Sequence, residues 1–175
     1  MSPEQVNALL DVTRLRAEID ADRTALAQCL EDCLELLRRW ANEVPEHAYL
    51  VTAACGLHGW YTGLEAVLER VARQVDGSIP TGERSHRILL SQEMTDFPGR
   101  RPAVLPRRLE PDLLALLSFR HFFRHAYGVR LDPARLRLEI ERLLRVEPAV
   151  TAALDSFDAF LAGCQEALSS EEIGE

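Results

Sequence analysis

The sequence predicts an all-α protein, and three observations point to this fold class. Hydrophobic residues make up 47% of the 175 residues, which is enough to close a sizeable core. Leu and Ala are abundant, β-branched residues are few, and the chain holds only 9 Gly and 9 Pro. Apolar residues recur at three- and four-residue steps over long stretches. We therefore expect an up-and-down bundle of about five helices.

Two long helices are expected in the first half of the chain. From about the N-terminus to Asn42, apolar residues follow one helical face and charged residues fill the other. After Val44 and Pro45 the same period resumes and continues to Val75, so a second helix returns beside the first.

The middle of the chain is expected to be less regular. Turn formers at 76–82 predict a loop, after which Ile88, Leu89 and Met94 support a short third helix. The prolines and glycine between Phe97 and Arg108 exclude a regular helix there. Because this stretch also holds four Arg, we expect an ordered basic loop.

Two further helices complete the bundle. Pro111 suits the first turn of a fourth helix that runs to Tyr127 and stops at Gly128, a left-handed C-cap. Asp132 and Pro133 supply an N-cap and a first-turn proline for a fifth helix, which runs to about Leu168 with a kink at Pro148. We expect one domain over 1–168 and a frayed acidic tail at 169–175.

Charge is distributed unevenly along the chain, whose formal net charge is −8. Residues 100–145 hold 11 Arg against five acidic residues, whereas both flanks are net acidic. A basic middle is typical of a local anion-binding surface. The alternative is a set of solvated arginines that pair with neighbouring acids.

From the remaining composition we expect a cytoplasmic protein that does not span a membrane. No apolar run reaches the roughly 20 residues of a membrane span, and the N-terminus lacks the pattern of a secretory signal. The four cysteines form no CxxC pair, so we expect buried, reduced thiols rather than a zinc site. No metal and no cofactor is expected.

The segment 118–128, SFRHFFRHAYG, concentrates the residues that carry chemistry. It places two Arg, two His and one Tyr within eight residues. Helical spacing puts Arg120 with Arg124 and His121 with His125 on shared faces. Arg120 and His125 lie about 140° apart around the helix axis. They converge on one ligand only if Arg120 reaches across or the last turn unwinds.

These residue types suit the cleavage of a phosphodiester. An imidazole moves protons near neutral pH, and a guanidinium stabilises charge on a phosphate oxygen. Attack by the 2′-hydroxyl of RNA needs one group that accepts a proton and one that donates a proton. A second copy of the chain, related by a two-fold axis beside the fourth helix, would supply the missing group.

Two simpler interpretations of the same residues stay open. Cations in the last turn of a helix complement its dipole, and a Tyr before Gly often only covers a core. The i, i+4 pair His121 and His125 also has metal-ligand spacing, although no third ligand is evident in the sequence.

The pattern at Arg120–Tyr127, RHFFRHAY, resembles the signature of HepT-like ribonuclease toxins of the HEPN superfamily. The order of elements and the continuation AYGVRLDPARL are also similar to that family, from the first helix to Leu168. The resemblance implies a HEPN-like helical bundle that forms a two-fold dimer and cleaves RNA without metal. It also implies a type VII toxin–antitoxin module with an MNT nucleotidyltransferase antitoxin as partner.

The resemblance assigns roles to individual residues. Arg120 and His125 become catalytic, His121 and Arg124 support them by orientation and phosphate contact, and Tyr127 becomes the site that the antitoxin adenylylates. An adenylate on Tyr127 would place an anion where the substrate phosphate binds. The acidic net charge requires the arginines of the basic region to gather near the dimer seam: Arg100, Arg101, Arg107, Arg108, Arg124 and Arg130.

The leading hypothesis is therefore a metal-independent endoribonuclease toxin. The alternative is a non-catalytic helical adaptor that binds a nucleotidyltransferase through the motif helix. A DNA-binding regulator is disfavoured, because the sequence lacks a compact helix-turn-helix pattern.

Overall fold

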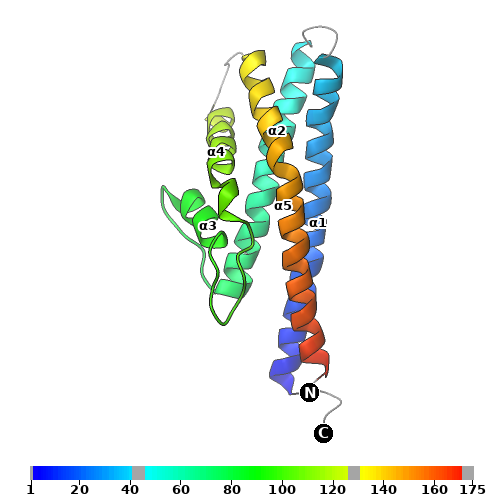
Figure 1. Ribbon diagram of the computed structural model, residues 1–175, viewed down its shortest axis with the longest axis vertical. Coiled ribbons are helices and arrows are strands. Elements are labelled where there is room, and N and C mark those ends of the chain that lie inside the picture. The colour runs from blue at the N-terminus through cyan, green and yellow to red at the C-terminus, as the bar shows by residue number, and fades with distance from the viewer. Residues whose placement is uncertain (1, 41–45, 126–130, 171–175) are drawn as a thin grey trace. The chain divides into compact units, whose positions relative to one another are not determined.

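The described chain is helical, as the sequence predicts (Figure 1). The computed structural model describes residues 2–40, 46–125 and 131–170. Within these ranges the α-helices are α1 (Pro3–Trp40), α2 (His47–Val71), α3 (Ser85–Glu93), α4 (Glu110–His125) and α5 (Pro133–Ser170). Each of the five expected helices is present, and the all-α fold class is confirmed.

The ends of two helices follow local sequence signals. Past α2 the chain continues as a π-helix, Ala72–Asp76, and ends at Gly77, whose φ of 79° is left-handed. The side chain of Asp132 accepts a hydrogen bond from the amide of Ala134 at 2.9 Å, which confirms the predicted N-cap of α5. Pro148 lies inside α5.

The chain divides into two compact units. Unit 1 comprises residues 1–21, 67–107 and 149–175, and unit 2 comprises residues 22–66 and 108–148. Each unit takes a segment from α1, α2 and α5, while α3 belongs to unit 1 and α4 to unit 2. The single domain over 1–168 stays a prediction.

Unit 1 contains a buried ionic cluster that fixes the basic loop. The guanidinium of Arg101 donates from Nε and Nη2 to the two carboxylate oxygens of Asp76, at 2.7 and 2.6 Å. Its Nη2 also lies 2.9 Å from Oε2 of Glu93, and the side chains of Arg101 and Glu93 are 0% exposed. The loop is ordered as predicted, but Arg101 cannot contribute to an anion-binding surface.

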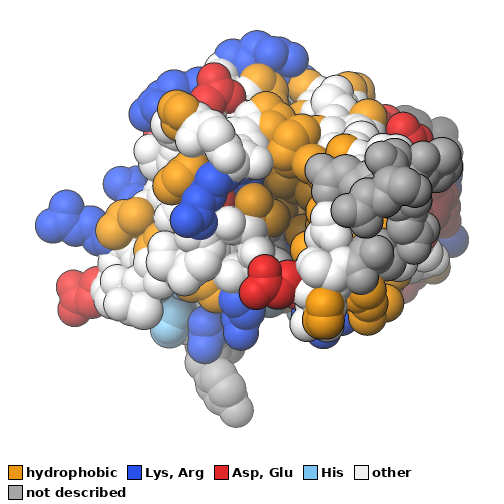
Figure 2. Space-filling view, turned by 90° about the horizontal axis from the view of Figure 1, so that it is seen from below, with side chains coloured by type: hydrophobic (Ala, Val, Ile, Leu, Met, Phe, Trp, Pro, Cys, Tyr) orange, Lys and Arg blue, Asp and Glu red, His pale blue; other side chains and the backbone are white. Residues whose placement is uncertain are grey.

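Arg100 is also engaged within unit 1. It donates to the main-chain carbonyls of Val75 and Asp76, at 3.2 and 3.0 Å, where the π-helix ends. It lies at the edge of a hollow of about 340 Å³ whose walls include Leu15 and Phe160. Figure 2, which views the molecule from below, shows hydrophobic and charged side chains intermixed on that face.

Unit 2 is built on a close approach of α1 and α2. A Cβ added at Gly56 would lie 2.8 Å from the carbonyl oxygen of Cys29, and one at Gly59 would lie 2.8 Å from its sulfur. The thiol of Cys33 is buried and contacts the carbonyl of Ala53 at 3.6 Å. Only glycine permits this separation of the two helices.

The cysteines depart from the sequence prediction, whereas the third helix forms where it was expected. All four cysteines are free thiols, but only Cys33 is buried, whereas Cys55 is exposed. In α3 the buried residues include Leu89 and Leu90, while Ile88 is 50% exposed. Among the described residues, no helix has the length and apolar character that a membrane span requires.

Candidate functional site

Helix α4 positions the motif within unit 2. Its first turn carries Glu110 and Asp112 and its last turn carries Arg124 and His125, so charges at both ends complement the helix dipole. The buried face is formed by Leu113, Leu116, Leu117 and Phe119. The carboxylate of Asp112 accepts a hydrogen bond from Arg142 of α5 at 2.7 Å, which ties the start of α4 to α5.

Arg120 continues the buried face of α4 and points toward α2. It lies three residues after Leu117 and four after Leu116, so helical periodicity directs it inward. Its side chain is 12% exposed and forms an ion pair with Glu65 of α2, Nη2 to Oε2 2.9 Å. Its Nε donates to the hydroxyl of Thr62 at 3.1 Å. Arg120 is therefore held in place by a partner that the sequence prediction missed.

The sequence around Glu65 indicates that this carboxylate is buried and needs a charged partner. Glu65 lies between the apolar residues Leu64 and Leu68 on α2, and its side chain is 7% exposed. A carboxylate at such a position needs a charged partner, because burial of an unpaired charge is costly. An Arg at an inward position of another helix is the natural counterpart. The pairing itself depends on how α2 and α4 pack, which periodicity does not give.

His125 lies on the exposed side of α4 with one ring nitrogen occupied. Its Nδ1 is 2.8 Å from the carbonyl oxygen of His121. Because a carbonyl only accepts, Nδ1 must carry the proton, which leaves Nε2 as the ring nitrogen that can accept one. In the neutral form of the ring, this contact therefore leaves Nε2 of the exposed His125 as the nitrogen available to a general base.

The supporting residues are also exposed. The rings of His121 and His125 lie 4.5 Å apart between centroids, as their spacing on one face predicts. Arg124 is exposed and forms no ion pair with another described residue. Tyr127, Gly128 and Arg130 lie outside the described residues, so the predicted modification site and C-cap are not part of this geometry.

A second imidazole faces the motif from α2. The ring of His58 lies 5.7 Å from the ring of Phe123 on α4. Burial lowers the pKa of His58, and the nearby guanidinium groups of Arg120 and Arg124 lower it further. His58 is therefore neutral near pH 7 and lies close to two cations. The sequence prediction did not single out His58, because no other candidate catalytic residue lies next to it in the sequence.

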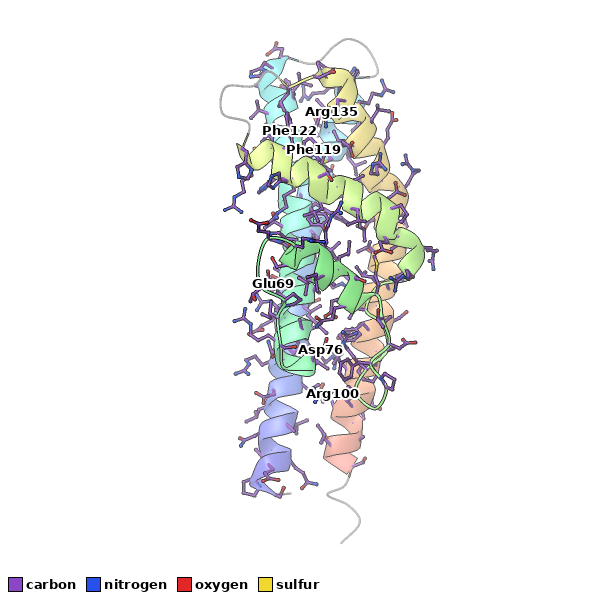
Figure 3. The ribbon with its side chains drawn as sticks, turned by 90° about the vertical axis from the view of Figure 1, so that its left-hand side faces the viewer. Glu69, Asp76, Arg100, Phe119, Phe122 and Arg135 are labelled. Atoms are coloured by element: carbon purple, nitrogen blue, oxygen red, sulfur yellow. The ribbon has the colours of Figure 1, made fainter. Side chains whose placement is uncertain are left out.

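The opposite side of α4 contacts α5. Figure 3 labels Phe122 and Arg135, and the guanidinium of Arg135 lies 5.1 Å from the centre of the Phe122 ring. Phe119 stacks on Phe123 along the helix with 6.0 Å between ring centroids. The contact of Phe122 with Arg135 of α5 and that of Phe123 with His58 of α2 join α4 to both neighbouring helices, in the rotation that sends Arg120 toward α2 and leaves His125 exposed.

The structure thus separates the two residues that were expected to share a ligand. Helix α4 stays regular to His125, so its last described turn does not unwind. Among the described residues, no contact joins the guanidinium of Arg120 to the imidazole of His125. Arg120 and His125 of one chain therefore present their groups on different sides of the helix.

The fold and the site together define a class of protein. Its members are helical, as the described residues of this chain are, and carry an Arg-x4-His motif, here on α4. The family model described as HepT-like protein matches residues 52–161, which include most of α2, all of α3 and α4, and most of α5. The chain belongs to the HepT-like family of the HEPN superfamily. No curated protein and no solved structure matches it.

Proposed function

We propose that this protein is a metal-independent endoribonuclease toxin, with Arg120 and His125 as its catalytic residues. Family membership supports a HEPN-type ribonuclease as the broad class. The observation that carries the finer proposal is the geometry of His125, whose Nδ1 is fixed by the carbonyl of His121 at 2.8 Å and whose Nε2 is left to accept a proton.

In the proposed reaction the RNA supplies its own nucleophile. Nε2 of His125 takes the proton of the 2′-hydroxyl as the 2′-oxygen bonds to phosphorus. The bond from phosphorus to the 5′-oxygen breaks, and an acid protonates the leaving oxygen. The products are a 2′,3′-cyclic phosphate and a 5′-hydroxyl. Arg120 stabilises the charge that develops on the phosphate oxygens in the transition state.

A two-fold dimer completes this proposed site. Within one chain, Arg120 points toward α2 while His125 is exposed, so one chain does not direct both groups at one phosphate. Two copies with their fourth helices side by side would place the Arg120 of one copy near the His125 of the other, and would also supply a second imidazole as the acid.

The distribution of charge supports RNA binding at unit 2. Unit 1 holds nine Arg against 15 acidic residues, whereas unit 2 holds 11 Arg against 13. The acidity of the chain thus resides mainly in the unit that lacks the motif. Because Arg124 is exposed and forms no ion pair with another described residue, we assign it a phosphate contact, and we assign His121 the orientation of His125.

Regulation by an MNT-type nucleotidyltransferase antitoxin is part of the proposal. The phenolic oxygen of Tyr127 would displace pyrophosphate from ATP and lose its proton, leaving adenylate on the tyrosine. Two residues separate Tyr127 from Arg124 in sequence, so the added phosphate would compete with RNA for the same cations. Intact-mass measurement after incubation with ATP and the antitoxin tests this step, because the adduct adds one adenylate.

The test of the proposed function compares the purified protein with His125→Ala on RNA in the presence of a chelator. We expect cleavage by the wild type and a loss of at least about 100-fold in the variant, in line with the removal of a general base. His86→Ala in α3 of unit 1 is the matched control and should cleave normally. A stable complex with the nucleotidyltransferase and no cleavage by the wild type would instead favour the helical adaptor.

A further inference from the structure

The strongest unassigned feature is the environment of Arg120 on α2. Two side chains one turn apart, Thr62 and Glu65, contact the same guanidinium. Glu65 is buried, with 7% of its side chain exposed, whereas Thr62 is exposed. Together these two different acceptors define the orientation of the guanidinium.

Both contacts use the same edge of the guanidinium. Thr62 accepts from Nε, and Glu65 accepts from Nη2, which together form the side edge of the planar fork. The end edge, formed by Nη1 and the second N–H of Nη2, is used by neither contact. The end edge also presents two parallel N–H groups, and such a pair can bind a phosphate through two hydrogen bonds.

The hydroxyl of Thr62 is oriented by its own helix. It donates its hydrogen to the carbonyl oxygen of His58 at 2.9 Å. Its oxygen lone pairs are therefore the groups that face Nε of Arg120, and the hydroxyl acts as an acceptor toward the cation. Helix α2 thus fixes the direction of this hydrogen bond before any substrate is present.

From these contacts we propose that Glu65 and Thr62 are positioning residues, which clamp the side edge of Arg120 so that its end edge meets the substrate phosphate. This role rests on the proposed nuclease function. The clamp holds the guanidinium in one orientation, so no free energy is spent on ordering a long side chain when the RNA binds. The negative charge of Glu65 also compensates the buried cation in the free protein.

The experiment measures kcat and KM for RNA cleavage by Glu65→Gln and Thr62→Val. We expect kcat to fall on the order of 10- to 100-fold with little change in KM, as for other residues that orient a catalytic group. Thr62→Ser keeps the hydroxyl and should restore most of the activity. Because Thr62 is exposed, its variants keep the test valid even if Glu65→Gln fails to fold.

Two matched controls separate positioning from general effects of charge and helix stability. Glu69→Gln changes the charge by the same amount one turn further along α2. Thr52→Val removes an exposed hydroxyl that, like that of Thr62, donates to the carbonyl four residues earlier, here that of Ala48 at 3.1 Å. Both variants should cleave RNA like the wild type.

Three other results would contradict the proposed positioning role of Glu65 and Thr62, and each can be told apart from the others. If Glu65→Gln cleaves no more slowly than Glu69→Gln while His125→Ala is inactive, the positioning role is wrong and the nuclease stands. Faster cleavage by Glu65→Gln would show that the carboxylate competes with the phosphate for Arg120. If the wild type itself does not cleave, both the proposed function and the clamp fall.

Discussion

The close approach of α1 and α2 can be tested by adding a single methyl group to it. At Gly56 the new Cβ would lie 2.8 Å from the main-chain oxygen of Cys29 and 3.0 Å from the Cβ of Asp32. Main-chain atoms cannot move aside cheaply, so we expect an overpacking cost of about 1–3 kcal/mol. Alanine recovers about 1 kcal/mol through its higher helix propensity.

The chain provides a control for the propensity effect. Gly163 lies in the interior of α5, and a Cβ there would meet nothing within 4 Å. Gly163→Ala should therefore gain up to about 1 kcal/mol, and Gly56→Ala should lose about 1 kcal/mol. In a chain of this size each kcal/mol corresponds to about 2–4 °C in Tm.

Thermal and urea denaturation followed by circular dichroism measure both variants. The expected order of stability is Gly163→Ala, wild type, Gly56→Ala. Equal stabilisation by the two substitutions would refute the close packing at Gly56, and with it the argument that this contact sets the position of α2. Helix α2 carries Thr62 and Glu65, so the result also bears on the site.

Three further predictions concern titration and helix capping. Burial raises the pKa of Glu93 from 4.5 to about 8, so the folded state retains its proton and the free energy of unfolding should fall as pH rises from about 4.5 to 8; Glu93→Gln should flatten this decline in pH-dependent melts. NMR titration should give His58 a pKa below 6.5, which rises in Arg124→Gln because one nearby cation is removed. Asp132→Ala should lower the free energy of unfolding by about 1 kcal/mol in urea denaturation, through loss of the α5 N-cap.

Periodicity and capping signals predicted the helices well because both act locally. The apolar residues that recur along one helical face predicted α1 and α2. Asp132 and Pro133 predicted the start of α5, since the cap involves residues only two or three apart. The π-helix at Ala72–Asp76 was not predicted, because its sequence continues the same apolar period.

The site was predicted only in part, for a physical reason. The residues of the motif are adjacent in sequence, so their shared faces on α4 followed from helical geometry. The partners of Arg120 come from 55 and 58 positions earlier in the chain, and their contact depends on how two helices pack. The role of Arg101 was misjudged for the same reason, because Asp76 and Glu93 meet it only after the loop folds.

The most direct test of the proposed shared site is subunit mixing. Arg120→Ala and His125→Ala proteins are each assayed alone for RNA cleavage, then unfolded together, refolded as a mixture and assayed again. If each site pairs the guanidinium of one copy with the imidazole of the other, the mixed dimer keeps one such pair, whereas neither component keeps any. Because the mixed dimer lacks the second imidazole that serves as the acid, cleavage should exceed that of both components but stay below roughly a quarter of the wild-type level at equal amounts. A mixture as inactive as its two components would contradict the shared site and assign Arg120 and His125 to unconnected roles.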